Sequence, residues 1–249
     1  MTRQTVPGLF ITGTDTGVGK TYVAACIART LAASGLRVGV YKPVASGCRR
    51  VAGGLISEDA VALWEAAGRP GDLNEVCPQR FAAPLAPPLA ARAEGREVDA
   101  ALLRRGLQSR LVRADVVLIE GAGGLMSPVT DTEFVADLAF DFGFPLVLVA
   151  ANVLGVINQT LQTLITAATF REGLEVAGVV LNHPRPPSPD DPSLATNRAE
   201  LERRSVPPIL AELAWQAREF QPAVAWRAIA HEGPLLASRQ AAGDCVALD

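Results

Sequence analysis

The sequence has almost no lysine, and histidine and cysteine are scarce as well. Of its 23 basic residues, only Lys20 and Lys42 are lysine, and the rest are arginine. The four cysteines are far apart without any C-x-x-C pair, and the only histidines are His183 and His231. These spacings argue against a metal-thiolate site and against a disulfide framework.

Long apolar runs and blocks of like charge are also missing. No stretch reaches the ~18 apolar residues that a membrane-spanning helix needs, and the first residues, MTRQTVPG, lack the apolar core of a signal peptide. The net charge of -3 offers no broad basic surface of the kind that nucleic-acid-binding proteins use. We therefore expect a cytoplasmic protein that binds neither nucleic acid nor membrane.

Short apolar runs alternate with longer amphipathic ones along the 249 residues, which is typical of βα units. We predict an α/β fold over residues 1–249, a single doubly wound domain with a mainly parallel sheet flanked by helices. The predicted strands are residues 9–12, 38–42, 116–120, 146–150, 176–182 and 209–213. The predicted helices are residues 20–34, 58–67 (with Ser57 as N-cap), 99–113, 133–142, 158–172 and 197–204.

Three segments do not follow this pattern. Residues 69–88 are rich in proline and are expected to be irregular. Residues 183–192 follow a strand and could either cover a ligand or form a plain surface connection. The packing of the C-terminal segment 220–249 is uncertain. The AVAWRAIA stretch in it could be a helix on the domain or an interface, and we favour the helix.

The stretch GTDTGVGKTY follows an apolar strand and opens a helix, which is the context of a phosphate-binding loop. Gly17 and Gly19 let backbone N–H groups converge on phosphate oxygens, and the helix that starts at Lys20 adds its dipole. Lys20 would meet the β- and γ-phosphates, and the Thr21 hydroxyl is placed to bind Mg²⁺. Thr14 stands where the general G-x-x-x-x-G-K-[ST] pattern has its first glycine, so the match to that pattern is incomplete.

The stretch ADVVLIEGAGG supplies an acidic residue at the end of a buried strand. Mg²⁺ prefers carboxylate oxygens together with phosphates and waters, so Glu120 is a candidate ligand. The glycines that follow let the backbone approach a ligand closely. By spacing alone, Asp59 is more simply an acid near a helix start, and Ser46 is a turn residue.

Six motifs together resemble one enzyme family. GTDTGVGKT, YKPVASG, SEDA, EGAGG, LGVIN and VVLN occur in the order and approximate spacing of the dethiobiotin synthases. The resemblance runs from residue 10 to residue 182 and includes RFAAPLAPPLAA. The pair GTDTGVGKT and KPVASG is its most specific part, and the early glycine is the family's own form of the loop. The resemblance implies a P-loop NTPase type of fold.

The resemblance also implies a reaction. Members of this family carboxylate 7,8-diaminononanoate with CO₂, phosphorylate the carbamate with ATP and close the ring, releasing ADP and phosphate. It therefore implies an ATP-dependent cyclo-ligase that uses Mg²⁺ and works as a homodimer. Every step makes or moves negative charge, which calls for positioned cations and not for a nucleophilic side chain.

By position, the resemblance implies that Mg²⁺ is held by Thr21, Asp59 and Glu120, which replaces the simpler interpretation of Asp59. Lys20 would stabilise the transferring phosphoryl group. Lys42 would lie by the carbamate and the γ-phosphate. Both lysines of the chain thereby receive a catalytic role.

The other implied contacts belong to the nucleotide and the substrate. Ser46 would bond the carbamate or a substrate nitrogen, and Asn182 would bind the adenine edge. The helix start at 155–158 of a second subunit would bind the tail carboxylate. His183 and the ELAW stretch at 212–215 depart from the family's pattern, which leaves the base preference open. The nucleotide-binding set is Thr16, Gly17, Val18, Gly19, Lys20, Thr21, Tyr22, Asp59, Glu120, Gly121, Ala122, Gly123 and Asn182; the substrate set is Ser46, Gly124, Gly155, Val156, Ile157 and Asn158.

Other functions agree less well with the residues. Regulatory or partitioning ATPases of the same branch usually carry a lysine early in the loop, where this chain has Asp15, and often end in a basic amphipathic helix. An amidotransferase-type synthetase needs a glutaminase domain, for which the chain is too short. A nucleotide-binding module without catalysis would not explain two isolated lysines and three separate candidates for Mg²⁺.

Overall fold

The computed structural model describes residues 6–187 and 191–232. Its centre is a sheet whose parallel strands lie in the order β10-β9-β8-β1-β7-β2. The short strand β11 (His231–Glu232) pairs antiparallel with the start of β1. The predicted α/β fold with a mainly parallel sheet is confirmed. The strands are β1 (Pro7–Gly13), β2 (Val38–Tyr41), β7 (Val116–Gly124), β8 (Leu146–Ala151), β9 (Val176–Asn182) and β10 (Ile209–Leu213).

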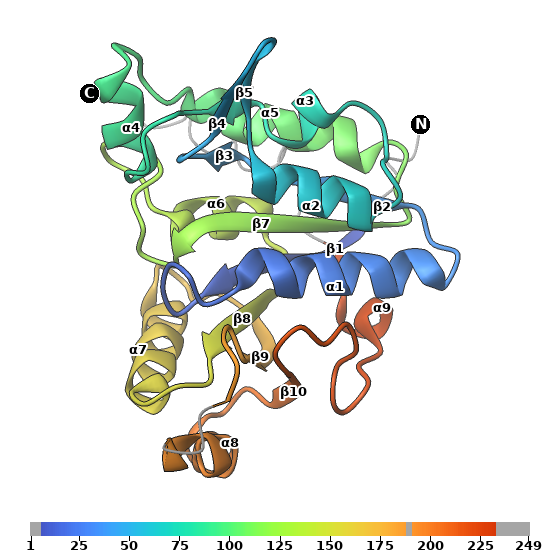
Figure 1. Cartoon of the computed structure of the whole chain (residues 1–249), viewed down its shortest axis with the longest axis vertical. Coiled ribbons are helices and arrows are strands. Elements are labelled where there is room, and N and C mark those ends of the chain that lie inside the picture. The colour runs from blue at the N-terminus through green and yellow to red at the C-terminus, as the bar shows by residue number, and fades with distance from the viewer. Residues whose placement is uncertain (1–5, 188–190, 233–249) are drawn as a thin grey trace, which may run out of the picture.

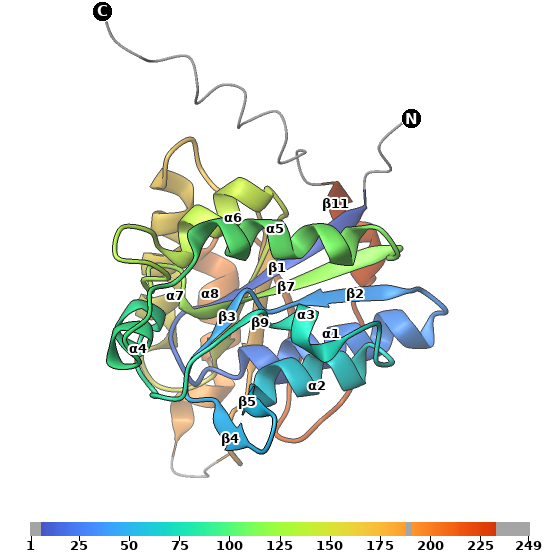
Figure 2. The same cartoon turned by 90° about the horizontal axis from the view of Figure 1, so that it is seen from above.

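Helices cover both faces of this sheet. Figure 2 shows the sheet between α1 and α2 on one face and α5 and α6 on the other, and Figure 1 shows α7 and α8 beside β9 and β10. Successive strand residues point to opposite faces: Val147 and Val149 pack in the core with α1, whereas Leu148 and Ala150 pack with α7. The helices are α1 (Lys20–Ala33), α2 (Glu58–Ala66), α5 (Ala100–Leu111), α6 (Val135–Phe142), α7 (Val156–Thr169) and α8 (Asn197–Arg204).

Side chains and glycines set where these helices begin. The Ser57 hydroxyl accepts the Ala60 N–H at 3.2 Å, which confirms Ser57 as the N-cap of α2. The helix predicted from residue 158 begins earlier, at Val156, because Gly155 takes a left-handed conformation with a φ of 96° and turns the chain into the helix. The helix predicted from residue 133 begins later, because Phe134 is still paired with Pro128.

Several short elements were not predicted. Residues 69–88 are mostly irregular, as expected, but they also contain α3, β6 and the start of α4. β6 forms by pairing with β3, which lies more than thirty residues earlier, so no local pattern announces it. Pro87 and Pro88 occupy the first turn of α4, where proline is tolerated. The short elements are β3 (Val44–Ala45), β4 (Arg49–Val51), β5 (Gly54–Ile56), α3 (Leu73–Val76), β6 (Gln79–Arg80), α4 (Pro87–Ala93) and the 3-10 helix η1 (Pro192–Ala195).

The described part of the C-terminal segment packs on the domain. The short helix α9 (Trp226–Ile229) buries Trp226, whose side chain is 2% exposed and whose ring lies 4.8 Å from that of Phe220. Both rings belong to the same hydrophobic core as the buried side chains of α1. The helix that we favoured in AVAWRAIA is therefore present. The rest of that segment, 233–249, and residues 188–190 of the proline-rich connection lie outside the described residues.

No helix in the described ranges is long and apolar enough to cross a bilayer.

Candidate active site

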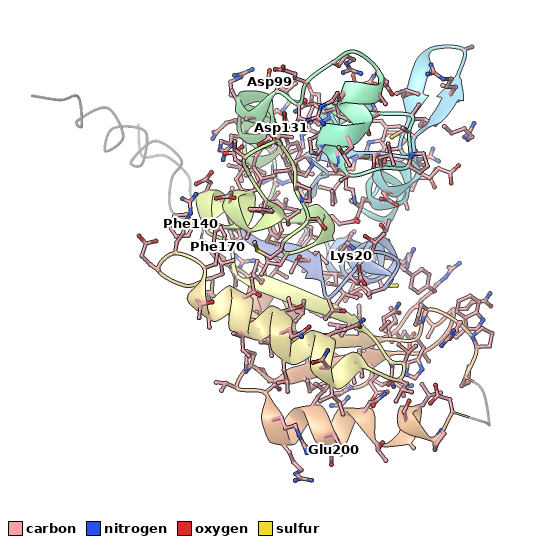
Figure 3. The ribbon with its side chains drawn as sticks, turned by 90° about the vertical axis from the view of Figure 1, so that its left-hand side faces the viewer. Lys20, Asp99, Asp131, Phe140, Phe170 and Glu200 are labelled. Carbon is pink, nitrogen blue, oxygen red and sulfur yellow. The ribbon has the colours of Figure 1, made fainter. Side chains whose placement is uncertain are left out.

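A cavity of about 570 Å³ lies at the carboxyl ends of β1, β2 and β7. Ligands of open α/β sheets bind at this edge. Figure 3 looks onto it, with Lys20 near the centre of the view at the start of α1. The predicted residues that line the cavity are Thr16, Gly17, Gly19, Lys20, Thr21, Lys42, Ser46, Asp59, Glu120, Ala122 and Gly123.

The loop between β1 and α1 is shaped by two glycines. Gly17 and Gly19 have φ values of 78° and 90°, which favour glycine because side chains strain this conformation. A Cβ atom on Gly19 would also lie only 2.1 Å from Nδ2 of Asn182, so any other residue here would displace the Asn182 amide. The strand, loop and helix thus follow in the order that a phosphate-binding loop requires.

Lys20 is buried, and its ammonium group hydrogen-bonds the backbone of its own loop. Nζ donates to the carbonyl oxygen of Asp15 at 3.0 Å, and the residue is 7% exposed. Burial lowers the pKa of Lys20 to about 8. Among the described residues no carboxylate lies within ion-pair distance of it. Phosphate oxygens at this place would supply the charge that the buried ammonium lacks.

Lys42 follows β2 and stands between two carboxylates. Its Nζ lies 2.6 Å from Oε1 of Glu120 and 3.1 Å from Oδ2 of Asp59, and its side chain is 4% exposed. Burial alone would lower the pKa of Lys42, but the attraction of Glu120 and Asp59 outweighs it and raises the pKa well above its usual range. Lys42 is therefore a fixed positive charge in the cavity wall.

Three oxygen-bearing side chains converge beside Lys42. The Thr21 hydroxyl donates to Oε1 of Glu120 at 2.8 Å, while Oε2 of Glu120 is buried without a hydrogen-bond partner. The half-buried Asp59 has a lowered pKa, because Lys42 outweighs the opposing effect of burial. A hydroxyl and two carboxylates, one of them with an unpartnered oxygen, suit a hard cation such as Mg²⁺.

This donor set is small. Within the ranges that the structure describes, no three His, Cys, Asp or Glu side chains gather in a way that could hold a metal ion. A cation bound here would complete its shell with waters and phosphate oxygens. That arrangement is usual for Mg²⁺ at nucleotide sites.

Asn182 and Tyr22 join the loop and α1 to more distant parts of the chain. Asn182 is 2% exposed, and its Nδ2 donates to the carbonyl oxygen of Val18 at 2.8 Å, while its Oδ1 is buried without a partner. The Tyr22 hydroxyl donates to the carbonyl oxygen of Ala217 at 2.8 Å. Val18, Asn182 and Tyr22 do not line the cavity, and their contacts with a nucleotide stay predictions.

The predicted substrate residues at the start of α7 are not among the residues that line this cavity. The α7 start, Gly155 with Val156, Ile157 and Asn158, lines no part of it. The neighbouring Leu154 is 83% exposed. α4 and α7 both lie on the side of the molecule where β1 and β7 end (Figure 1). A role of this segment in substrate binding stays a prediction.

Two glycines of EGAGG serve close packing. A Cβ atom on Gly121 would lie 2.8 Å from a methyl group of Val135, and one on Gly124 would lie 3.3 Å from the carbonyl oxygen of Gly13. Neither lines the cavity. Small residues are needed here because β7 passes close to α6 and to the loop after β1.

Sequence reasoning missed several residues of the cavity wall. Ser127 and Pro128 line it from the connection between β7 and α6, and residues 84–87 line it from the start of α4. The motif RFAAPLAPPLAA could have indicated the part of the wall that residues 84–87 form. Nothing marked Ser127, because a single serine after a turn is common in any sequence.

A family model and several known proteins match most of this chain. Residues 7–220 match a family model described as an AAA domain. An ATP-dependent dethiobiotin synthetase of Anaeromyxobacter dehalogenans strain 2CP-C is 47% identical over 84% of this chain and 90% of that protein. One of Rhodopirellula baltica is 45% identical over 82% of each chain. One of Escherichia coli strain K12 is 36% identical over 84% of this chain and 90% of that protein.

One solved structure is similar at a lower level. The signal recognition particle receptor FtsY from Elizabethkingia anophelis is 19% identical, with a TM-score of 0.44. The match covers 85% of this chain and 59% of that protein.

Proposed function

We propose that this chain, which belongs to the ATP-dependent dethiobiotin synthetase family, makes dethiobiotin from 7,8-diaminononanoate, CO₂ and ATP, releasing ADP and phosphate. One observation carries the proposal. Lys20 and Lys42, the only lysines of the chain, lie in one cavity with Asp59 and Glu120, beside a phosphate-binding loop. A reaction that develops negative charge at each step needs cations fixed in this way.

The chemistry has three steps. An amine nitrogen of the substrate attacks CO₂ and loses a proton, which gives a carbamate. A carbamate oxygen then takes the γ-phosphoryl group, and the bond between that group and ADP breaks. Finally the second amine attacks the carbamoyl carbon and loses a proton, while the C–O bond breaks and phosphate leaves with the electron pair.

The two lysines divide this work. Lys20 would contact the oxygens of the γ-phosphoryl group, because it stands at the first residue of α1 with its ammonium group against the loop. Lys42 would exchange its pairs with Glu120 and Asp59 for oxygens of the carbamate. Ser46 lines the same cavity as Lys42, and its hydroxyl would donate to the carbamate.

Thr21, Asp59 and Glu120 would hold Mg²⁺. When bound, the ion would neutralise charge on the phosphate oxygens. The buried, unpartnered Oε2 of Glu120 supports this assignment, because a buried carboxylate oxygen without a donor is costly unless a ligand satisfies it.

We further propose a homodimer in which the start of α7 binds the substrate's tail carboxylate in the partner's site. Residues 155–158 do not line the cavity of their own subunit, which supports this arrangement, as does the exposed Leu154 beside them. Backbone N–H groups at a helix start favour a carboxylate. The contact of Asn182 with the adenine edge and the cytoplasmic location stay predictions.

The test is product formation by the purified protein. It is incubated with MgATP and bicarbonate, with and without 7,8-diaminononanoate, and ADP and dethiobiotin are measured together by mass spectrometry. We expect both products, in equal amounts, only when the diamine is present. ADP release that ignores the diamine would sink the assignment and would favour an ATPase.

A further inference from the structure

β7 leaves the regular sheet after Glu120. Residues 11 and 13 of β1 pair with Glu120 and Gly124, so between these pairs β7 has three residues where β1 has one. The extra residues form a bulge. Gly123 in this bulge lines the cavity and has a φ of 77°. The glycine backbone can adopt many conformations, so a neighbouring group has to hold the bulge in one of them.

Ser127 holds this bulge. The N–H of Gly124 donates to Oγ of Ser127 at 2.9 Å, and the N–H of Ser127 donates to the carbonyl oxygen of Gly124 at 3.0 Å. A Cβ atom on Gly123 would lie 2.3 Å from Oγ of Ser127 and 3.5 Å from Oγ1 of Thr16. The bulge is therefore packed between the Ser127 hydroxyl and the phosphate-binding loop.

The Ser127 hydroxyl also has a proton to give. A hydroxyl group donates one hydrogen bond and accepts up to two. Oγ accepts from Gly124, while no acceptor for its proton occurs among the described hydrogen bonds of Ser127. The residue is half-buried and lines the same cavity as Lys20 and Lys42. An anionic oxygen in the cavity would provide the missing acceptor.

We propose that Ser127 holds the phosphorylated carbamate in place until the second amine closes the ring. It fixes the Gly123 bulge against the ligand and donates its hydroxyl proton to an anionic oxygen. The proposal rests on the proposed function. A carbamoyl phosphate that is held loosely can instead react with water: water adds at the carbonyl carbon, the C–O bond breaks, phosphate leaves, and the carbamate returns to amine and CO₂.

The deciding quantity is the amount of ADP released per dethiobiotin formed. We expect a ratio of one for the wild type and a ratio clearly above one for Ser127→Ala. We also expect kcat/KM for the diamine to fall about tenfold or more, since a hydrogen bond to a charged group is lost. The affinity for ATP without diamine should change less than about twofold, because the loop and Lys20 are intact.

Two further variants complete the design. Ser127→Thr keeps the hydroxyl and should restore the ratio to near one. Ser34→Ala, an exposed serine at the far end of α1, is the matched control and should change nothing. If a thermal melt shows that Ser127→Ala is not folded, Ser127→Cys replaces it. The thiol has about the size of the hydroxyl but is only a weak donor, so we expect the same rise in the ratio and the same fall in kcat/KM.

The outcomes separate the two proposals. A ratio of one with unchanged kcat/KM in Ser127→Ala would overturn the role of Ser127. So would an equal loss of both products with weakened ATP binding, because that result indicates support of the fold alone. A wild type that forms no dethiobiotin contradicts the proposed function and, with it, this inference.

Discussion

Lys42 and Glu120 depend on each other more than any other charged pair of the site. Both side chains are almost fully buried, at 4% and 1% exposure. Removing one member of such a pair leaves a charge buried without compensation, whereas replacing both members is far milder. Breaking the pair that serves the chemistry is therefore expected to destabilise the fold as well.

This dependence can be measured by unfolding. Lys42→Met should lower the free energy of unfolding by about 3–5 kcal/mol and abolish turnover while leaving ATP binding nearly intact. The double variant Lys42→Met with Glu120→Gln should regain most of that stability but no activity. Urea unfolding of the three proteins and of Arg50→Met, an exposed control, checks this. Equal stabilities of the single and double variants would refute the coupling.

Glu120 has a second consequence at the level of metal binding. Glu120→Gln removes one negative charge from the proposed Mg²⁺ ligands, so the Mg²⁺ concentration for half-maximal dethiobiotin formation should rise about tenfold or more. Binding of Mn²⁺ in the presence of ATP, followed by electron paramagnetic resonance, should weaken in parallel. Unchanged metal dependence in both measurements would remove Glu120 from the ligand set.

Among the elements, those with a strong local pattern were predicted well. β9, β10 and α8 have the predicted bounds, because apolar runs mark the two strands and a run of helix-forming residues, NRAELERR, marks α8. The start of α7 was not predicted correctly, because it depends on the conformation of Gly155. The pair β3–β6 was not predicted either, because it depends on pairing between segments that are far apart in the sequence. Neither the conformation of Gly155 nor the β3–β6 pairing can be predicted from the local sequence.

The same distinction explains the site. Lys20, Thr21 and Glu120 could be found from their motifs. Asp59 could not be told from an ordinary helix-start acid by spacing, because only the fold brings the first turn of α2 to 3.1 Å from Lys42. Ser127 gave no sequence signal at all, since its significance lies in the shape of the bulge that it contacts.

α9 gives a prediction at the scale of a single element. Trp226 is 2% exposed against Phe220 in the core that α1 shares, so Trp226→Ala should cost about 3–5 kcal/mol of stability. Arg227→Ala changes an exposed residue of the same short helix and is the control. Melting temperatures and urea midpoints of both variants provide the measurement. Similar values for Trp226→Ala and the wild type would show that α9 contributes little to the domain.

For the whole molecule, the question is whether each site takes residues from two copies of the chain. If it does, a Lys42→Ala subunit, whose α7 start is intact, can complete the site of an Asn158→Asp subunit. The cavity of the Asn158→Asp subunit is intact, but its added negative charge at the helix start would repel the tail carboxylate. Each variant alone should be nearly inactive. Refolding an equal mixture should restore about a quarter of the wild-type rate, because half of the randomly formed dimers would carry one complete site.

The control for this experiment mixes Lys42→Ala with Lys20→Ala. Both changes lie in the same cavity, so no pairing of these subunits gives a complete site with an intact α7 start from the partner. Light scattering on the same samples reports the number of subunits. A monomer, or a mixture that stays inactive in the first experiment, would contradict the shared site.

The burial of both lysines in one cavity has a practical consequence for chemical labelling. Lys20 and Lys42 are 7% and 3% exposed, and every other basic side chain apart from the two histidines is an arginine. A lysine-directed acylating reagent therefore has side-chain targets only inside this cavity. Because Glu120 and Asp59 keep Lys42 protonated, the informative position is Lys20, whose pKa is lowered to about 8. The extent of acylation at Lys20, read from a peptide digest, would report whether a ligand covers this side chain.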